Sequence, residues 1–370
     1  MEAASPSEPI PAPALRELVE ARFPGARLLA VRPLSPDAGG DGAGTTTKAA
    51  GYGRPLLLIA ERAGGEMLRL VFRTGAPGGF GHDRRSDRAA DAILAFDRFG
   101  AIPRHVRALD VGAIDRSGAL RSLASTDELY LLTEYAPGEV YASDLRAIAR
   151  GGALEPRGER RLDALVDALL EIHRPAVGPS DYRRAVRDVV GHGEGVFGVL
   201  DSYPEATPAA APARLHQLEQ LCQAWRWRLR AFEHRGRRIH GDFHPFNLLF
   251  HGDADLRLLD ASRGCAGDPA DDVTALAVNY VFFAVDAEGA WQRGLGDLWR
   301  RLWTGYARRS GDGELLLVAP LFLAWRLLVV CNPVFYPDLS PGGRDRLLGL
   351  AERALTAERF DPMFAEELFR

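Results

Sequence analysis

Two aspartates and an asparagine stand close together in one short stretch of this chain, each beside apolar residues. Asp242 lies five residues before Asn247, apolar residues 248–250 follow, and Asp260 comes directly after the apolar pair 258–259. Phosphoryl transfer from a nucleotide uses one carboxylate to accept the proton of the attacking hydroxyl. It also uses an amide and a second carboxylate to hold Mg²⁺ against the phosphates. The residue types and their spacing therefore predict a site for phosphoryl transfer.

The order of these groups is that of the kinase catalytic loop, in which H-R-D-x-x-x-x-N precedes D-F-G. Here Gly241 stands in place of the arginine, and Asp260, Ala261 and Ser262 stand in place of D-F-G. We interpret the chain as a small-molecule kinase.

Two motifs carry a resemblance to a known family: His240-Gly241-Asp242-x-His244-x-x-Asn247 and, after Asp260, Gly267-Asp268-Pro269-x-x-Asp272. In these motifs the chain resembles the aminoglycoside phosphotransferase and choline kinase family, which has the protein-kinase-like fold. The resemblance implies that Asp242 is the catalytic base or hydroxyl-orienting group, and that Asn247 and Asp260 bind Mg²⁺ with ATP as the phosphate donor. It also implies that Asp272 is structural and ties the loop after the metal site to the larger lobe.

His240 and His244 are assigned to the catalytic site together with Asp242. The pattern H-x-D-x-H also resembles a zinc cluster, but no further His, Cys or Glu triad stands at ligand spacing, which disfavours zinc. We expect His240 to brace the loop by packing, and His244 to lie near the phosphates or Asp260. Asp268 and Asp272 precede or open a helix, so capping is an alternative role for both.

The charged residue after the metal carboxylate has two interpretations. Arg263 either clamps the transferring phosphoryl group or pairs with Asp268 or Asp271. We favour the structural pairing, because two acidic residues lie within a few positions.

The nucleotide phosphates are expected to meet basic residues of the strand at 67–72. The family has a lysine on its third strand, paired with the phosphates and with a helix glutamate. This sequence has Arg69 and Arg73, which alternation puts on the same side, and Asp87 and Asp91 are the nearest acidic candidates. A guanidinium grips phosphate oxygens bidentately, so arginine is a workable replacement.

Two further segments bear on nucleotide binding. The glycine-rich residues 39–53, with Lys48 among them, either close over the phosphates with backbone N–H groups or form a disordered loop. At the junction of the two predicted lobes, Glu134 and Ala136 offer backbone C=O and N–H groups to adenine.

The pattern of apolar residues predicts an α+β, bilobal architecture with a flexible tail at 1–13. A nucleotide-binding N-lobe at 14–134 begins with a helix at 14–23 and holds a small antiparallel sheet of about five strands and a helix at 84–99. The C-lobe at 135–370 is mainly helical and carries the catalytic loop and the acceptor site. The N-lobe strands are expected at 27–31, 56–60, 67–72, 106–111 and 129–133, with a hairpin turn at Gly64-Gly65. The C-lobe helices are expected at 143–150, 160–173, 181–189, 215–232, 270–285, 291–309, 314–330 and 343–357.

Composition excludes several classes of protein. The net charge is −4, and acidic and basic residues are mixed along the chain, which disfavours nucleic acid or an anionic membrane as partner. The three cysteines form neither a disulfide framework nor a metal motif, and the apolar run 315–331 is broken by Pro320 and Arg326. We therefore expect a cytoplasmic protein that crosses no membrane and has no obligate protein partner.

The acceptor is expected to be a small molecule with a hydroxyl group, similar to an aminoglycoside, an amino alcohol or a sugar. Candidate contacts are Asp201, Tyr203 and the segments 191–195 and 332–338, although 191–195 is more simply a surface loop. The six tryptophans lie mostly at helical spacing and are expected in the core rather than in a cage for a quaternary amine. The rival functions are a nucleotide-binding pseudokinase or regulatory module, and a kinase with a protein acceptor.

Overall fold

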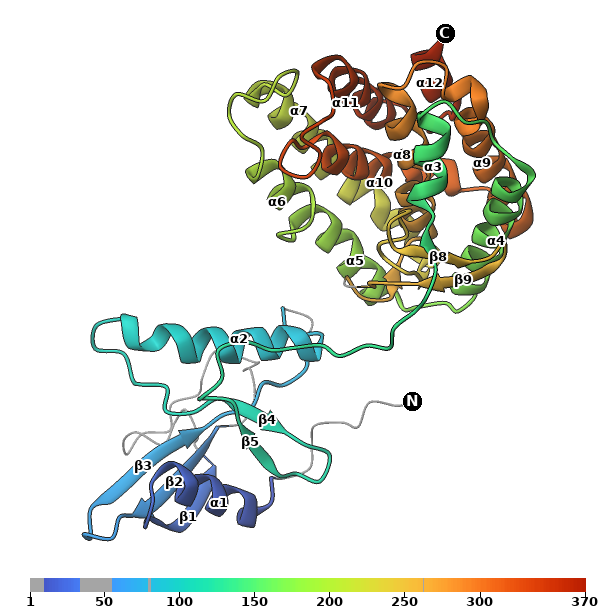
Figure 1. Cartoon of the computed structure of the whole chain (residues 1–370). Coiled ribbons are helices and arrows are strands. Elements are labelled where there is room, and N and C mark those ends of the chain that lie inside the picture. Colours follow the sequence, from blue (N-terminus) through green and yellow to red (C-terminus); the bar gives the residue numbers. More distant parts are fainter. Residues whose placement is uncertain (1–9, 34–54, 79–80, 262) are drawn as a thin grey trace. The chain divides into compact units, whose positions relative to one another are not determined.

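The computed structural model describes residues 10–33, 55–78, 81–261 and 263–370, and the chain divides into a first unit, Met1–Thr133, and a second unit, Glu134–Arg370 (Figure 1). Lys48, the whole glycine-rich segment 39–53 around it, and Ser262 lie outside the described residues, as does most of the expected tail.

The first unit is built on a three-stranded antiparallel sheet in the order β1 (Arg27–Pro33), β2 (Leu56–Glu61) and β3 (Met67–Phe72). The turn between β2 and β3 is closed by hydrogen bonds between the backbones of Arg62, Gly65 and Glu66, so the expected hairpin is confirmed. Leu58 and Ala60 of β2 share a small core with Leu15 and Val19 of α1 (Ala12–Arg22). The strand alternation therefore buries one face of the sheet against a single amphipathic helix.

The rest of the first unit differs from the expectation. α2 (Arg85–Arg98) is confirmed, but residues 106–111 and 129–133 form no strand. A hairpin of β4 (Gly112–Ile114) and β5 (Leu120–Ser122) forms instead. Its turn is set by Asp115, whose carboxylate accepts the N–H groups of Ser117 and Ala119. This aspartate turn fixes where the chain reverses between β4 and β5.

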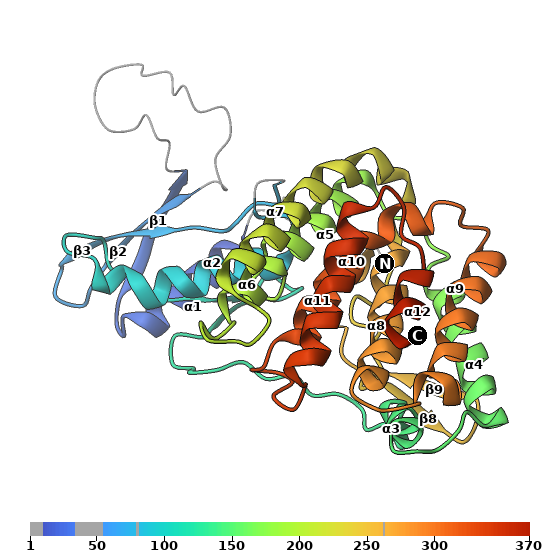
Figure 2. The same cartoon turned by 90° about the horizontal axis from the view of Figure 1, so that it is seen from above.

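The second unit consists mainly of helices (Figures 1 and 2). They are α3 (Ala142–Ala149), α4 (Pro156–Ile172), α5 (Pro179–Gly191), α6 (Val196–Asp201), α7 (Pro212–Arg228), α8 (Pro269–Val285), α9 (Gly296–Ser310), α10 (Leu315–Cys331), α11 (Pro341–Thr356) and α12 (Met363–Glu366). Short 3-10 segments at Leu229–Arg235 and Glu367–Phe369 and a π-helical turn at Trp291–Leu295 complete the helical part. The strands are β6 (Glu139–Val140), β7 (Arg237–Arg238), β8 (Leu248–His251), β9 (Asp255–Leu258) and β10 (Ala266–Gly267). The helices expected from the sequence are confirmed, and α6 and α12 were not foreseen.

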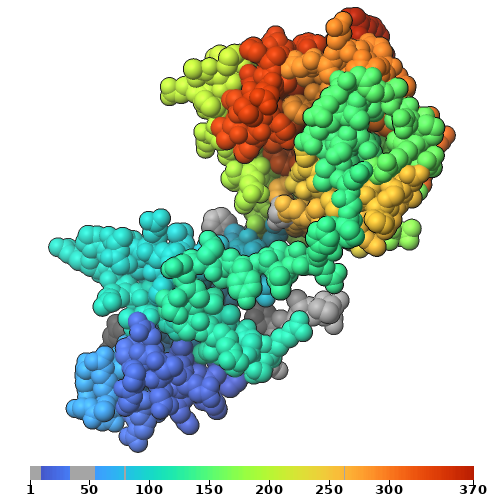
Figure 3. Space-filling view, viewed as in Figure 1, coloured from blue at the N-terminus to red at the C-terminus, as the bar shows by residue number. Residues whose placement is uncertain are grey.

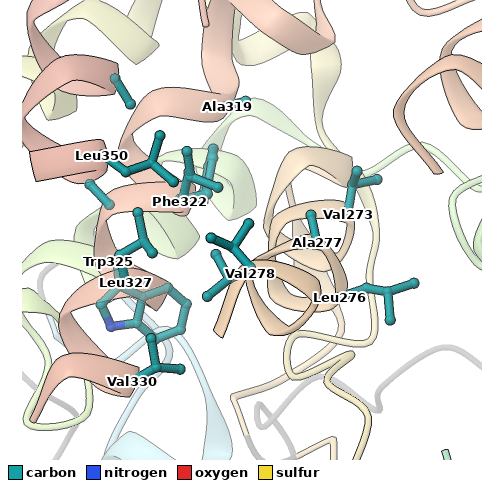
Figure 4. Packing of buried hydrophobic residues seen from close by; sticks show 14 of the residues in the cluster. Val273, Leu276, Ala277, Val278, Ala319, Phe322, Trp325, Leu327, Val330 and Leu350 are labelled. Atoms are coloured by element: carbon teal, nitrogen blue, oxygen red, sulfur yellow. The ribbon is translucent and has the colours of Figure 1, made fainter. Parts of the chain in front are cut away.

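The core of the second unit is centred on α10, which packs against α8 and α11. Val278 of α8, Phe322, Trp325 and Leu327 of α10, and Leu350 of α11 meet there (Figure 4). α10 is apolar on nearly all sides because helices cover nearly all of its surface. Within the described ranges, no helix combines the length and the apolar character needed to cross a membrane.

A buried arginine fixes the β8–β9 hairpin to the neighbouring helices. Arg161 of α4 is fully buried, donates to both carboxylate oxygens of Asp144 at 2.8 and 2.7 Å, and donates to the carbonyl oxygen of Gly252 in the β8–β9 turn at 2.8 Å. Its guanidinium also lies over the ring of Phe250. Figure 3 shows α3 and α4, in green, beside the gold residues of this hairpin on one face of the second unit. The hairpin that leads to Asp260 therefore rests on a rigid helical support.

Replacement of a core phenylalanine is expected to destabilise the second unit strongly. Phe322→Ala should lower its free energy of unfolding by about 3–5 kcal/mol, because a buried aromatic side chain leaves a cavity. Phe335→Ala is the matched control: Phe335 is 52% exposed, and its loss should change stability by only about 0.5 kcal/mol. Urea unfolding followed by tryptophan fluorescence measures this, since all six tryptophans lie in the second unit. Equal effects of the two replacements would contradict the assignment of this core.

Candidate active site

A buried carboxylate on α8 holds the loop that carries Asp242. Asp272 is fully buried, and its two oxygens accept the backbone N–H groups of His240 at 2.7 Å and Gly241 at 2.8 Å. Gly241 has φ +86°, a left-handed conformation that glycine adopts without strain, and a Cβ there would lie 3.0 Å from the carbonyl oxygen of Gly264. Glycine therefore replaces the kinase arginine at a position where the backbone turns and is closely approached.

Asp272 is itself fixed by a second pair of residues. His173, the residue after α4, lies with Nε2 3.1 Å from Asp272 and with Nδ1 2.7 Å from the hydroxyl of Tyr306 on α9. Burial opposes ionisation of Asp272, but His173 and the two backbone N–H groups outweigh it and lower the pKa of this carboxyl. We expected Asp272 to tie the loop after the metal site; its bonds go instead to the loop that precedes Asp242.

The carboxylate of Asp242 is gripped on both oxygens. Arg326 of α10 donates to Oδ1 at 2.6 Å, and Asn247 donates its side-chain N–H to Oδ2 at 3.1 Å. His244 lies with Nε2 3.2 Å from the same Oδ2. The Asp242 side chain keeps 21% exposure, so a small part of the carboxylate stays open to an incoming group.

The backbone assigns the tautomer of His244. The N–H of Phe246 donates to Nδ1 of His244 at 3.3 Å, so in the neutral ring Nε2 carries the proton and donates to Asp242. His244 thus contacts Asp242, whereas we expected it near the phosphates or Asp260. His240 is buried, accepts the N–H of Asp242 on Nδ1 and meets Phe243 edge-on, which is the bracing role expected for it.

These contacts change the acidity of Asp242. Burial raises the pKa of its carboxyl, but the hydrogen bond from His244 and the charge of Arg326 outweigh burial. The pKa of Asp242 is therefore well below its usual range, and the group is ionised at neutral pH.

The β8–β9 hairpin pairs the segment that begins after Asn247 with the segment that ends before Asp260. Leu248 pairs with Leu258, and the N–H of Leu259 donates to the carbonyl oxygen of Asn247 at 2.9 Å. Asp260 follows at once, exposed and with φ +49°, a left-handed conformation uncommon for a residue with a Cβ. Such local strain is found at functional sites.

These two residues offer the oxygen ligands that Mg²⁺ prefers. Both amide hydrogens of Asn247 face Asp242, through its carboxylate and its carbonyl oxygen, which leaves Oδ1 to act as an acceptor. With the carboxylate of Asp260 this gives two protein oxygens, and Mg²⁺ usually takes one or two carboxylates with phosphates and waters. In the part of the chain that the structure describes, no group of three or more His, Cys, Asp or Glu residues is arranged to hold a metal ion.

Sequence reasoning noticed Arg326 only as a break in an apolar run. It is 8% exposed, and besides Asp242 it contacts the carbonyl oxygen of Gly241 at 2.9 Å and the carboxylate of Asp271 at 3.0 Å. Asp271 also accepts from Arg263, so the structural pairing expected for Arg263 is confirmed. The signal that would have found Arg326 is a single charge within a helix that is otherwise apolar, because such a charge must be paired when it is buried.

Comparison with known proteins now decides the class of this site. A model of the phosphotransferase enzyme family matches residues 56–311, which is more than half of the chain. The chain belongs to the phosphotransferase enzyme family. It is thus an enzyme of the small-molecule phosphotransferase class, and the expected protein-kinase-like α+β fold is confirmed.

Solved structures show distant similarity to this phosphotransferase. An aminoglycoside phosphotransferase from Streptomyces rimosus, in complex with ADP and streptomycin, is 20% identical over 49% of this chain and 66% of its own, with a TM-score of 0.32. A glucosamine kinase is 16% identical over 95% and 100% of the two chains, with a TM-score of 0.40. A macrolide 2'-phosphotransferase from Brachybacterium faecium is 16% identical over 93% and 97%, with a TM-score of 0.28. No curated protein sequence matches the chain significantly.

The residues expected to bind the nucleotide of the phosphotransferase lie far in sequence from the loop that carries Asp242. Arg69 stands on the exposed face of β3, and Arg73 follows that strand and is exposed as well. The acidic candidates on α2 have local contacts: Asp87 accepts the N–H of Arg84 at 2.8 Å, and Asp91 lies 2.9 Å from His82. Glu134, which begins the second unit, is exposed, and Ala136 is partly buried.

Of the residues expected to contact the acceptor, two make hydrogen bonds within the fold, and one is influenced by the charge of Asp242. The hydroxyl of Tyr203 donates to the carbonyl oxygen of Leu328, and Asn332 is buried and donates to Ser202. Tyr336 differs: burial, and then the negative charge of Asp242, raise the pKa of its hydroxyl.

The remaining candidates have simpler roles. Asp201 is exposed at the end of α6. Residues 191–194 are exposed or form the end of α5, as a surface loop would be. Five of the six tryptophans are buried or nearly so, as expected, and Trp227 is exposed.

Loss of the Asp272 charge is expected to destabilise the enzyme in a pH-dependent way. Asp272→Asn should lower the free energy of unfolding by about 3 kcal/mol at neutral pH, since a buried charge network loses one partner. The pKa of Asp272 is lowered on folding, so its contribution is complete above its unfolded-state pKa of about 3.9 and is lost as the pH falls through the folded value.

Urea unfolding at several pH values measures the difference between wild type and variant. The difference should shrink as the pH falls below about 4. Asp253→Asn, at an exposed ion pair, is the matched control and should change stability little at any pH. A gap between wild type and Asp272→Asn that widened in acid would refute the role given to this carboxylate.

Proposed function

We propose that this protein transfers the γ-phosphate of ATP, with Mg²⁺, to a hydroxyl group of a small molecule. The observation that carries the proposal is the ionised carboxylate of Asp242, held between Arg326, His244 and Asn247 at the mouth of an anchored loop. Catalysis of phosphoryl transfer is mostly positioning and charge neutralisation, and a rigid, partly open carboxylate is suited to positioning.

Asp242 acts in this proposal as a group that orients the acceptor hydroxyl rather than as a strong base. A general base works best when its pKa lies near the operating pH, and the pKa of Asp242 is far below that. The transition state of phosphoryl transfer is loose, so the hydroxyl keeps its proton until late and needs direction more than deprotonation. The exposed part of the carboxylate would accept a hydrogen bond from that hydroxyl.

Asn247 and Asp260 would hold Mg²⁺ through Oδ1 of the amide and the carboxylate. The ion, when bound, would neutralise the charge of the β- and γ-phosphates. The main contribution of the chain is to fix the two ligands relative to each other, which the bond between Leu259 and the Asn247 carbonyl does. The left-handed backbone of Asp260 sets the direction of its carboxylate.

For the rest of the nucleotide we propose contacts in the N-lobe, 14–134, and at the start of the C-lobe, 135–370. Arg69 or Arg73 would grip phosphate oxygens, and the backbones of Glu134 and Ala136 would meet adenine. The acceptor would be similar to an aminoglycoside, an amino alcohol or a sugar, and Tyr336 would be its neighbour beside Asp242. We also propose that the enzyme works in the cytoplasm.

A nucleotide-binding pseudokinase is the second candidate. It is favoured by the sequence, which has Arg69 and Arg73 where the family has a lysine, and Asp87 and Asp91 where the family has a glutamate. Slow Mg²⁺-dependent hydrolysis of ATP by the purified protein would exclude this candidate, since it requires an intact catalytic set.

Nucleotide binding is expected to depend on Mg²⁺ and on Asp260. Titration calorimetry of wild type should show ATP binding that weakens strongly when Mg²⁺ is removed, and Asp260→Ala should abolish the Mg²⁺-dependent part. Asp255→Ala, on the same hairpin and exposed, is the matched control and should bind as wild type does. Mg²⁺-dependent binding that survived in Asp260→Ala would reject this residue as the metal ligand, and no binding to wild type would reject the kinase assignment.

Turnover is expected to depend on Asp242 far more than nucleotide binding does. Asp242→Ala should lower kcat by about 10²–10⁴-fold, the range for removal of a positioned proton-handling group. The dissociation constant of MgATP should change little, because Asp242 faces the acceptor rather than the metal. Hydrolysis of ATP by a coupled assay, with calorimetry beside it, measures both quantities. A kcat of Asp242→Ala equal to that of wild type would contradict the proposed function.

A further inference from the structure

α10 carries one charged residue into the centre of the second unit. Leu315–Cys331 is otherwise apolar, yet Arg326 is 8% exposed and lies next to the buried ring of Trp325. Removing a guanidinium from water is costly, and replacing buried ion pairs with apolar residues is often neutral or stabilising. Stability alone therefore gives a weak reason for an arginine at this position.

The contacts of Arg326 all lead to the catalytic loop and its support. One Nη donates to the carboxylate of Asp242, and the other donates to the carbonyl oxygen of Gly241 and to Asp271. Its Nε is buried and makes no hydrogen bond to any described residue. A buried N–H without an acceptor costs free energy, so the position of this side chain is set by its contacts with Asp242, Gly241 and Asp271.

The peptide before Asp242 is clamped from two helices. Asp272 of α8 accepts the N–H of Gly241, while Arg326 of α10 donates to the C=O of the same residue. Asp272 thus fixes only backbone, whereas Arg326 fixes both backbone and the Asp242 carboxylate. Rotation of that carboxylate away from its position would break the 2.6 Å contact with Arg326.

Two arginines share one aromatic ring and one carboxylate here. The guanidinium groups of Arg263 and Arg326 lie 4.1 and 4.0 Å from the ring centroid of Trp325, and both donate to Asp271. Arg263 belongs to the segment just after Asp260. Through Asp271 and Arg326, the segment after the proposed metal ligand is therefore connected to Asp242.

We propose that Arg326 is a positioning residue of the phosphotransferase, which fixes the orientation of the Asp242 carboxylate toward the acceptor hydroxyl. This inference rests on the proposed function. A planar guanidinium is needed, because Asp242, Gly241 and Asp271 are contacted at once. A lysine ammonium at this place keeps the charge but reaches fewer of the three acceptors.

The test compares Arg326→Gln, Arg326→Lys and the control Arg235→Gln. Arg235 is as deeply buried and grips two carboxylates, those of Asp268 and Asp312, but it does not contact Asp242. All variants are purified as the full chain, their melting temperatures are measured, and Mg²⁺-dependent ATP hydrolysis is assayed well below those temperatures. Water takes the place of the acceptor hydroxyl in this assay, so no acceptor needs to be known.

A positioning role predicts a split between kcat and KM. In Arg326→Gln, kcat should fall by about 10²-fold, the cost of a misplaced reacting group, while KM for MgATP stays within about twofold. Arg326→Lys should recover about tenfold of that loss, since it keeps a cation beside Asp242. Arg235→Gln should melt at a lower temperature and keep the kcat of wild type.

The outcomes separate this inference from the function on which it rests. A wild-type protein that neither binds nor hydrolyses MgATP would reject both. An active wild type with an Arg326→Gln variant of unchanged kcat, or with an equal loss of kcat in Arg235→Gln, would overturn the positioning role alone. If Arg326→Gln does not fold, Arg326→Lys decides: a folded variant with reduced kcat supports the role, and one with the kcat of wild type overturns it.

Discussion

The active site depends on a buried carboxylate that serves as a hydrogen-bond acceptor for backbone. Asp272 receives the N–H groups of His240 and Gly241, and His173 and Tyr306 complete its surroundings. An ionised group without water is tolerated only when its oxygens are fully engaged, so the loop has one energetically acceptable position. The positions of Asp242, Asn247 and the β8–β9 hairpin, which follow in the chain, therefore depend on the fixed backbone at His240 and Gly241.

A second charged network lies beside the first. Asp271 directly precedes Asp272 on α8, and it faces Arg263 and Arg326 while Asp272 faces the loop. Neighbouring residues of one helical turn thus serve two networks, because their side chains leave the helix in different directions. Two carboxylates, of Asp242 and Asp271, face two guanidinium groups, of Arg263 and Arg326, so the formal charges within this second network balance.

The parts of the site that the sequence predicted are those whose geometry is local. Asn247 and Asp260 stand at the two ends of a tight hairpin, and hairpin register follows from apolar pairs such as Leu248 and Leu258. Arg326 was missed because its partners Asp242 and Gly241 lie 84 and 85 residues away, and no periodicity reports such a contact. In the first unit the apolar pattern did not predict the hairpin at the Asp115 turn, and the expected strands at 106–111 and 129–133 do not form, because β propensity depends on the packing around a segment.

The backbone of Asp260 sets a limit on how this enzyme can change over evolutionary time. Its left-handed φ of +49° is readily adopted by glycine and at small cost by asparagine and aspartate, whereas other side chains would strain the end of β9. A descendant that no longer needed a metal carboxylate would therefore replace it first by asparagine or glycine. The left-handed backbone at position 260 would be kept after the metal carboxylate is lost. Asparagine or glycine at this position would then indicate a family member that binds its ligand without catalysing phosphoryl transfer.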